Sequence, residues 1–515
     1  MRITFAAGIN ENGSQAIDPQ ECAAGKNFEL GLNVNYFKPR AAFAHYATAP
    51  VVTSVTGLMQ LIKRDDSTTT LVAAGASVYN LTSAPAFTSV GSITAGSKLR
   101  DVYWSLDDYL IITDITKTTV VKKWDGTTFS TLTTGLGATS LYAKYGVVHN
   151  GRVWLFNVKT STDTPHLMVA SAYENPTSYD ISARAPSVTA FATGNEAFYM
   201  LTPDLLPING VVVFQNQLII STERGRLFKL TGTDANDYAW TQFYQGSAAQ
   251  GTETMVNMGN DVAFMKEGGS IDLLSSTQNF GDVRADDLTR WIPDTVRGLT
   301  DGIAAYDQAN QKVYWFVANK VLVLFKDILP ARLSPWSVYR TDHACGFNTS
   351  AVRYMRIPGT TNFRVFFGDS TGKVHYLGGT NEGDGDTLTP ITTQRKTALL
   401  EGNVLSNLLL ANVQYRRLAQ VDLSVAVEFA EEYNTSTATI TLKGPTTSLA
   451  GSVFGGSAYF GGEFYFGSGF IGASQPSVRA FSHVGYGRAF TVQTTVNSTK
   501  PFQVDFLELE IDSAR

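Results

Sequence analysis

Hydrophobic and polar positions along this chain repeat in one order: an apolar run, a small polar turn, a second apolar run, a glycine turn and a third apolar run. The runs begin at Gly57, Asp101, Gly146, Gly210, Thr254, Gly302 and Ala351. The first turn of each repeat falls at Asp66, Asp108, Asn150, Asn216, Asn260, Asn310 and Thr361, in steps of 42, 42, 66, 44, 50 and 51 residues. A period of about 40–50 residues with several strands per repeat is typical of β-propeller blades. The pattern therefore predicts an all-β fold with a β-propeller-like body of about seven units.

Three regions differ in pattern. Residues 1–50 contain no repeat and are predicted to form an extended N-terminal arm, whereas residues 51–395 hold the propeller. Within the propeller, the apolar residues near 180–207 do not alternate, which indicates an inserted loop or short helix. Residues 396–515 alternate like long strands and are predicted to form a separate C-terminal antiparallel β domain.

A glycine-rich stretch at 451–472 (GSVFGGSAYFGGEFYFGSGFIG) separates aromatic doublets with glycines. One interpretation is a pair of tight hairpins whose rings pack on their own domain. The other is a protruding loop that contacts another subunit or a cell surface, because many rings on a glycine chain are hard to bury in one small domain. The candidate interface residues here are Phe454, Tyr459, Phe460, Phe464, Tyr465, Phe466 and Phe470.

Composition limits the function classes. Only 17% of the 515 residues are charged, the formal net charge is -5, and Thr, Ser, Gly and Asn fill the difference. Few charges suit a surface that packs against copies of itself, and the acidic balance argues against tight wrapping of nucleic acid phosphates. The start of the chain lacks a secretory signal, and no run of 18 apolar residues predicts a membrane span.

Known catalytic and ligand-binding motifs are missing from the sequence. No phosphate-binding loop, HExxH or GxSxG occurs, and Cys22 and Cys345 fit no metal spacing. The acidic run at 381–386 begins like a calcium loop, but Thr387 and Thr393 stand where glycine and glutamate are required. Trp291 beside Asp286 and Asp287 is weak evidence for a sugar site. We therefore predict no catalytic, cofactor or metal site, and a protein that is not an enzyme.

The signatures of three known propeller families do not fit. No repeat carries the Ser-x-Asp-x-Gly-x-x-Trp turn of sialidases, and Trp124-Asp125 occurs once instead of ending each repeat as in WD40 proteins. The Gly-Gly pairs at 268–269 and 378–379 are isolated, unlike those of kelch blades.

Short motifs at both ends and in the third repeat carry a different resemblance. They are Gly8-Ile9-Asn10, Glu21-Cys22, Gly25-Lys26-Asn27-Phe28, Phe37-Lys38-Pro39-Arg40, Asn150-Gly151-Arg152-Val153-Trp154, Ala170-Ser171, Glu174-Asn175-Pro176-Thr177-Ser178-Tyr179, Gly487-Arg488-Ala489-Phe490 and Pro501-Phe502-Gln503-Val504. In this succession the chain resembles the tail nozzle, or packaged DNA stabilisation, family of short-tailed phages. The segment after Asp180 and the Gly/aromatic stretch have no counterpart in that resemblance.

The resemblance implies a structural protein of the virion tail, assembled in the host cytoplasm. It would form a homohexameric ring below a tail adaptor or portal ring, beside tail fibre or tailspike proteins. It would retain packaged DNA and pass it through a channel during ejection, without sequence-specific binding, cofactor or membrane span. The candidate interface residues in the N-terminal arm are Asn27, Phe28, Tyr36, Phe37, Pro39 and Arg40. Among them, Phe28, Tyr36 and Phe37 carry large apolar rings but have no blade of their own to fill, so we expect them to contact the C-terminal domain or a neighbouring subunit.

Two alternatives remain open. The first is a phage or bacterial propeller that binds or cleaves glycans with Trp and Asp side chains on one face. The second is a scaffold propeller of a host cell.

Overall fold

The computed structural model describes residues 2–3, 7–12, 20–30, 36–83, 86–132, 140–179, 193–224, 226–245, 249–274, 287–331, 333–379, 383–397, 400–416, 419–429, 435–442, 477–481 and 485–513. These residues are nearly all in strands and turns, and they divide into two compact units. The propeller unit comprises His45–Asn319 and Cys345–Leu377; the long-strand unit comprises Met1–Ala44, Lys320–Ala344 and Gly378–Arg515. No helix among the described residues is long and apolar enough to cross a membrane.

The propeller unit is a succession of small antiparallel sheets, one for each predicted repeat. In the first four sheets the strands follow chain order. The first holds β4 (Val55–Ile62), β5 (Thr68–Ala74), β6 (Ser77–Ser83) and β7 (Ala86–Ser92). The second holds β8 (Leu99–Trp104), β9 (Tyr109–Asp114), β10 (Lys122–Trp124) and β11 (Phe129–Thr131). The third holds β12 (Tyr142–His149), β13 (Arg152–Lys159), β14 (Asp163–Ala170) and β15 (Phe198–Leu201). The fourth holds β16 (Ile208–Phe214), β17 (Gln217–Thr222), β18 (Arg226–Thr231) and β19 (Ala239–Gln245).

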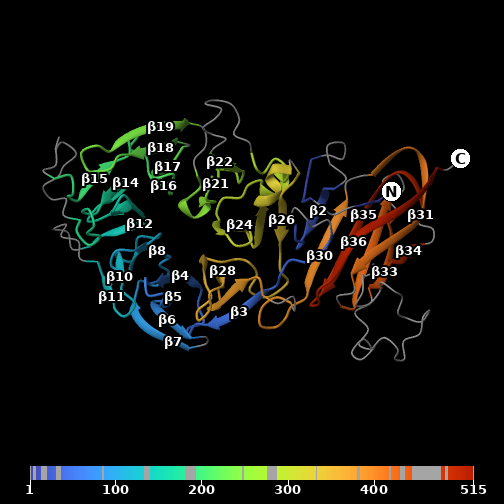
Figure 1. Cartoon of the computed structure of the whole chain (residues 1–515), viewed down its shortest axis with the longest axis horizontal. Coiled ribbons are helices and arrows are strands. Elements are labelled where there is room, and N and C mark those ends of the chain that lie inside the picture. The colour runs from blue at the N-terminus through green and yellow to red at the C-terminus, as the bar shows by residue number, and fades with distance from the viewer. Residues whose placement is uncertain are drawn as a thin grey trace. The chain divides into compact units, whose positions relative to one another are not determined.

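The later sheets are shorter. The fifth has three strands, β20 (Val256–Asn257), β21 (Val262–Met265) and β22 (Ile271–Leu273), preceded by the 3-10 turn η2 (Thr252–Thr254) and followed by the helix α2 (Pro293–Val296). The sixth begins with the hairpin of β23 (Ile303–Asp307) and β24 (Lys312–Val317). The seventh orders β27 (Val352–Arg356), β28 (Phe363–Gly368) and β29 (Lys373–Leu377) before β3 (Phe43–Thr48). Figure 1 shows these sheets succeeding one another around a common centre, from blue at β4 to orange at β28.

The prediction of an all-β, propeller-like fold is confirmed. Each predicted first turn joins the first two strands of a sheet. Asp66, Asp108, Asn150 and Asn216 adopt positive φ angles there, which these short polar residues tolerate better than most. One difference lies in the predicted insertion near 180–207, because Phe198–Leu201 is a strand that pairs with β14.

Apolar side chains form the core of the propeller unit between neighbouring sheets. Five clusters join the seventh sheet to the first, the first to the second, the second to the third, the third to the fourth, and the fourth to the fifth. Phe316 of β24 packs against Phe367 of β28 at 5.5 Å between ring centroids, and the Trp315 indole donates to the Thr254 carbonyl at 3.1 Å. The ring of contacts is therefore continuous within this unit.

Trp104, Trp154 and Trp315 lie on β8, β13 and β24 and are buried in the propeller unit. Trp154 packs edge-on against Phe198 and Tyr238, with centroids 5.3 and 5.0 Å away. The neighbouring Arg152 is fully buried and donates to the Ser171 and Glu196 carbonyls at 2.7 Å each. It therefore ties a strand to two loops instead of facing a ligand.

The long-strand unit brings both ends of the chain into one nine-stranded sheet, ordered β1-β36-β31-β35-β30-β2 with β32, β33 and β34 attached. Its strands are β1 (Arg2–Ile3), β2 (Cys22–Lys26), β30 (Ile391–Thr397), β31 (Leu400–Arg416), β32 (Val421–Phe429), β33 (Thr435–Leu442), β34 (Ser477–Phe481), β35 (Gly485–Ser498) and β36 (Gln503–Ser513). The same unit contains the hairpin of β25 (Lys320–Phe325) and β26 (Trp336–Tyr339), joined through the 3-10 segment η3 (Lys326–Ala331). The N-terminal residues described here are thus strands and bridges of a folded unit.

Candidate functional site

A pocket of about 160 Å³ lies in the propeller unit where several first strands begin. Its walls come from five places in the sequence, because the first strands of the blades converge there. Lys98 directly precedes β8, Glu253 lies in η2 before β20, and Asp301 precedes β23. Asn348 and Thr349 lead into β27. The start of the innermost strands is where a propeller surrounds its central channel, so this pocket occupies the axis end of the blades.

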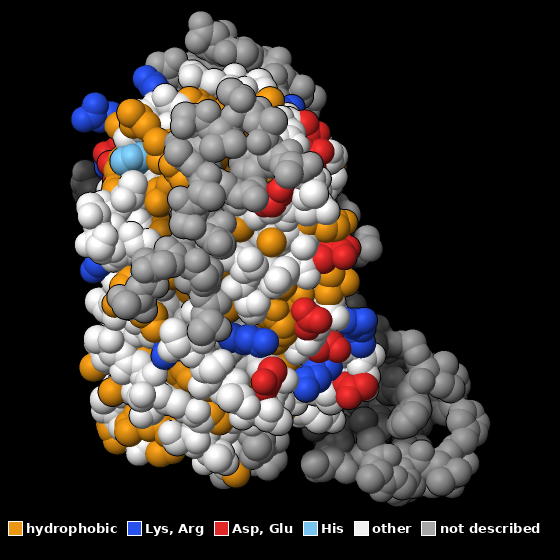
Figure 2. Space-filling model, turned by 90° about the vertical axis from the view of Figure 1, so that its left-hand side faces the viewer, with side chains coloured by type: hydrophobic (Ala, Val, Ile, Leu, Met, Phe, Trp, Pro, Cys, Tyr) orange, Lys and Arg blue, Asp and Glu red, His pale blue; other side chains and the backbone are white. Residues whose placement is uncertain are grey.

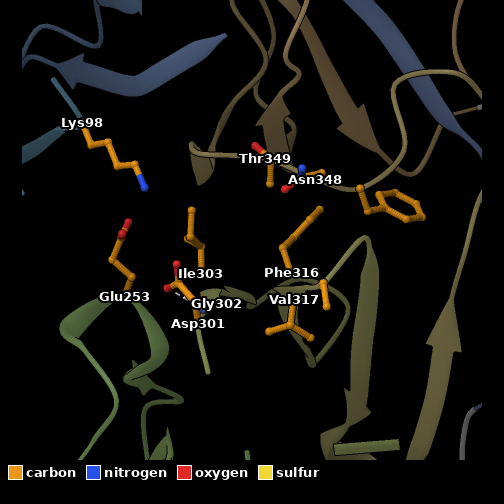
Figure 3. A pocket seen from close by; sticks show the side chains of 11 residues that line it. Lys98, Glu253, Asp301, Gly302, Ile303, Phe316, Val317, Asn348 and Thr349 are labelled. Carbon is orange, nitrogen blue, oxygen red and sulfur yellow. Dashed lines mark hydrogen bonds between the residues drawn. The ribbon is translucent and has the colours of Figure 1, made fainter. Parts of the chain in front are cut away.

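The charged side chains gather at one end of the pocket, and the apolar side chains lie beside them, opposite two uncharged polar residues. In Figure 3 the Lys98 ammonium and the Glu253 carboxylate point toward one another across the space, and Asp301 lies beside Glu253. Ile303, which lies next to Asp301, and Phe316 point toward Thr349 and Asn348. Such a mixture of a few placed polar groups with an apolar wall is typical of small-molecule sites.

Gly302 gives the pocket its shape. A Cβ atom at this position would collide with the Val317 side chain and would lie 3.2 Å from the Phe316 carbonyl. The Gly302 amide donates to the Asp301 carboxylate at 2.8 Å, which fixes the direction of that carboxylate. A larger residue at Gly302 would therefore push β23 away from β24 and alter the pocket wall.

Arg100 joins several blades and contacts the pocket residue Glu253. Its guanidinium forms an ion pair with Glu253 and donates to the Thr56 carbonyl at 3.1 Å and the Ser350 carbonyl at 2.8 Å. These three partners belong to the fifth, first and seventh blades, and Arg100 itself to the second, so one side chain joins four blades at their inner strands. Glu253 is oriented by this pair, whereas the Lys98 ammonium has no hydrogen bond or ion pair to any residue that the structure describes.

A second charged contact lies on the same inner strands. Arg353 of β27 donates to the Asp101 carboxylate of β8 at 3.1 Å, and the Gln60 amide lies 3.4 Å from the same oxygen. The side chain of Asp101 is almost fully buried, so the pair joins the seventh blade to the second across the first. The propeller centre is therefore lined by paired charges, with Lys98 and Asp301 at its rim.

The candidate interface residues of the N-terminal segment lie together inside the long-strand unit. Asn27, Phe28, Phe37, Pro39 and Arg40 are buried and Tyr36 is half-buried. The Arg40 guanidinium donates to Asp384 at 2.8 Å and to the Asn27 side-chain oxygen at 3.0 Å. Their contacts in this chain are internal, and their role at a subunit interface stays a prediction.

The two termini of the long-strand unit meet through the same residues. Phe37 and Val504 exchange two backbone hydrogen bonds of 2.7 and 2.9 Å, and the Phe37 ring packs 5.5 Å from that of Phe502. The Asn27 amide group also donates to the Thr392 carbonyl at 2.8 Å. These contacts join residues that lie hundreds of positions apart in the sequence.

The remaining candidate residues of the Gly/aromatic stretch, between 451 and 472, lie outside the described residues: Phe454, Tyr459, Phe460, Phe464, Tyr465, Phe466 and Phe470. The acidic loop at 381–386 is described from Gly383 onward. Its Asp384 is buried and paired with Arg40, and its Asp386 lies 3.2 Å from the His343 ring. Trp291 is buried with the Arg290 guanidinium 4.1 Å above its ring, so that ring face is covered.

One group among the described residues combines side chains that can ligate a metal. Cys345, Asp369 and His375 of the propeller unit place one donor atom each within 4.8 Å of one another. Cys22, by contrast, lies in the long-strand unit, where burial raises the pKa of its thiol to about 11. Its thiol is therefore protonated near neutral pH and unsuited to ligation or attack.

Charges are mixed on the surface seen in Figure 2. Lys, Arg, Asp and Glu side chains of the described residues occur there in small groups of both signs among many uncharged polar side chains. A protein that wraps nucleic acid presents clustered Lys and Arg. This face of the described part therefore lacks the pattern of a phosphate-binding surface.

No known family model matches the chain, and no curated protein sequence matches it. Solved structures with a similar course of strands include virginiamycin B lyase from Staphylococcus aureus, with 11% identity, a TM-score of 0.41, and coverage of 63% of this chain and 95% of that chain. A streptogramin B lyase structure gives 10% identity, a TM-score of 0.40, and coverage of 64% and 95%. Sqt1 from Saccharomyces cerevisiae gives 10% identity, a TM-score of 0.37, and coverage of 66% of this chain and 99% of that chain.

These neighbours correct one prediction. The sequence predicts a protein that is not an enzyme, and this prediction is contradicted because two of the similar structures are lyases. The physical reason is that catalytic groups in a propeller come from separate blades and leave no continuous motif to find. At this level of identity the likeness concerns the arrangement of strands, and no activity is transferred from it.

Proposed function

We propose that this β-propeller protein is the tail nozzle of a short-tailed bacteriophage, which retains packaged DNA and forms its exit channel. The observation that carries the proposal is that the motifs of the resemblance, far apart in sequence, are bonded to one another in the fold. Phe37 of the N-terminal motif pairs with Val504 of the closing motif. Arg152 of the Asn150–Trp154 motif donates to the carbonyl of Ser171, which belongs to the next motif of the same blade.

Further motif residues have specific structural duties in the long-strand unit. Gly8 has no room for a Cβ atom against the Trp336 backbone. Asn10 donates to Glu21 at 2.5 Å, and Glu21 in turn accepts from the Ser334 amide at 2.6 Å. Since each of these short motifs is used by the same buried network, they support a shared architecture more strongly than their length suggests.

Electron microscopy of the purified full-length chain tests this proposal. We expect ring-shaped particles with six-fold symmetry and an axial opening, together with a hexamer mass. A matched control is the Lys98→Gln variant, which changes the pocket and should leave the rings intact. A chain that stays monomeric at all concentrations up to those of a packed tail would contradict the nozzle.

The pocket favours a second candidate, a propeller that binds or cleaves glycans. Glu253 and Asp301 offer carboxylate acceptors, Lys98 an ammonium donor and Thr349 a hydroxyl, beside the apolar Ile303 and Phe316. Sugar hydroxyls require alternating donors and acceptors, and the apolar face of a sugar ring packs on apolar side chains.

Binding to surface polysaccharide fragments tests the second candidate. Calorimetry should show saturable binding that falls about tenfold or more in the Lys98→Gln and Asp301→Asn variants, since a hydrogen bond to a charged group is worth about 1.5–3 kcal/mol. Release of reducing ends would identify cleavage. Equal binding by the variants, or none by the wild type, would reject the pocket as a glycan site.

A further inference from the structure

A buried side-chain cluster in the seventh blade has the composition of a transition-metal site. Asp369 directly follows β28, His375 lies on β29, and Cys345 lies in the loop before β27. The imidazole of His375 is fully buried and the carboxylate of Asp369 is 2% exposed, whereas Cys345 is half-buried. One donor atom from each residue lies within 4.8 Å of the other two.

The spacing of two of the donors suits ligands of one ion, although without an ion they are close enough to share a hydrogen bond. His375 Nε2 and Asp369 Oδ2 are 3.3 Å apart. Two nitrogen or oxygen ligands, each about 2.0 Å from a tetrahedral zinc ion, lie about 3.3 Å from one another. The pair therefore already has the separation of two corners of a tetrahedron.

The surrounding side chains hold these donors in place. The Phe367 ring stacks on His375 with centroids 5.2 Å apart, and the His45 ring packs edge-on at 5.5 Å. The Asp369 carboxylate accepts from the Thr371 and Lys373 amides at 2.8 Å each. Orientation of ligands by such outer contacts is a common property of metal sites.

A comparable aspartate in another blade shows what the turn alone requires. Asp114, after β9, accepts from the Thr116, Thr118 and Thr119 amides, as Asp369 accepts from the turn that it begins. No histidine or cysteine joins Asp114 in a metal-ligand group within the described sequence. The turn therefore explains the aspartate at 369 but does not explain the neighbouring thiol and imidazole.

We propose that Cys345, Asp369 and His375 bind a borderline transition-metal ion such as Zn²⁺, with a fourth position for water or another small ligand. Thiolate and imidazole ligands select such ions over Mg²⁺ and Ca²⁺. Binding would convert the Cys345 thiol into a thiolate and release its proton to the solvent. The site is independent of the nozzle and of the glycan pocket.

Cobalt titration of the reduced full-length protein tests the proposal. We expect saturation at one Co²⁺ per chain, with a thiolate-to-cobalt absorption in the near ultraviolet and the strong visible bands of a tetrahedral ion. Added Zn²⁺ should displace the bound Co²⁺, and the absorption bands of the cobalt complex should then disappear. Their absence at millimolar cobalt, or only the weak bands of hydrated ion, would overturn the site.

Single substitutions distinguish a loss of metal ligands from a general loss of folding. Cys345→Ser should remove the thiolate band and weaken binding at least about 100-fold, the upper range for changes even to outer contacts. Cys22→Ser should leave the titration unchanged. Asp369→Asn should weaken binding, whereas Asp114→Asn, which disturbs the equivalent turn, should not. A titration of Cys345→Ser identical to wild type would disprove the assignment, and the half-buried position of this residue makes a folded variant expected.

Discussion

The interactions inside the propeller unit differ from those inside the long-strand unit. In the propeller unit, consecutive sheets bury apolar clusters between them, so partners in the core are neighbours in the sequence order of the blades. In the long-strand unit, distant segments meet, as strand β1 near the start of the chain pairs with β36 near its end, and the charged groups of Arg40 and Asp384 are buried. The comparison indicates that the core of the first unit joins consecutive blades, whereas the second unit joins segments from distant parts of the chain, in part through a buried ion pair.

The largest effect should come from breaking the buried pair of the long-strand unit. Replacing Arg40 with Ala leaves the Asp384 carboxylate buried without its cation, for which the expected loss is about 3–5 kcal/mol in the free energy of unfolding. Hydrogen exchange measured by mass spectrometry should show the loss in strands β30 and β36. A variant that removes both charges, Arg40→Met with Asp384→Leu, should recover part of it. Equal exchange in wild type and Arg40→Ala would contradict the role of the pair.

In the propeller unit, a cavity should weaken two blades and spare the others. Leu110 is fully buried between the first and second sheets, and its change to Ala is expected to cost about 2–5 kcal/mol. Exchange should rise in β4 to β11 before it rises in β16 to β19. The exposed Leu106 provides a control, because its change to Ala should have little effect. Uniform loss of protection in all blades would show that the sheets do not open separately.

The turn that begins at Asp114 should contribute less to the free energy of unfolding, and its contribution should depend on pH. Burial alone raises the pKa of Asp114, but hydrogen bonds from the Thr116 hydroxyl and from the Thr119, Thr118 and Thr116 amides lower it overall. A carboxyl whose folded pKa lies below its unfolded value of about 3.9 stabilises the fold above that pH, and this stability is lost as the pH falls further. Asp114→Asn should therefore cost about 1.5–3 kcal/mol at neutral pH. Denaturation curves should converge with wild type as the pH falls well below 4, and a constant difference would argue against the charge.

The smallest effect should come from an exposed ion pair. Arg297 lies 2.8 Å from Asp294 across one turn of α2, and both side chains are mostly exposed. Asp294→Asn is expected to change the free energy of unfolding by about 0.3–0.5 kcal/mol, and salt should remove the difference. Thermal unfolding at low and high salt measures this change. A loss above about 1 kcal/mol would mean that the pair has a larger structural role than its exposure indicates.

The sequence predicts the propeller unit well because its determinants are local. Asp66 and Asn150 mark turns because of what those residue types tolerate in the backbone, and the apolar runs beside them alternate as strands do. The inner pocket is different. Lys98 and Glu253 are brought together only when the ring of blades closes, so their spacing along the chain does not predict that they share a pocket.

The long-strand unit shows the same limit in another form. Phe28 and Phe37 have no apolar repeat around them, so the sequence predicts that they contact the C-terminal domain or a neighbouring subunit, and the contact with a subunit stays a prediction. Their partners in this chain, Pro39 and Val504, are a local bridge and a strand at the opposite terminus. Pairing over such distances depends on the whole sheet, whereas hydrophobic alternation reports only which face of a strand is buried.

Strand β3 gives the propeller a distinct order of assembly during synthesis. It precedes every blade in the chain, yet it completes the sheet of β27, β28 and β29, with Tyr46 packed 5.4 Å from Phe366 and 6.2 Å from Tyr376. During synthesis, β3 therefore leaves the ribosome before all the blades, whereas β27, β28 and β29 of the same sheet leave it after the other six. The early blades can form as they emerge, but the ring closes only after the seventh sheet has left the exit tunnel. Contacts of such long sequence separation form slowly, so premature termination anywhere before β29 yields a row of blades with two exposed ends.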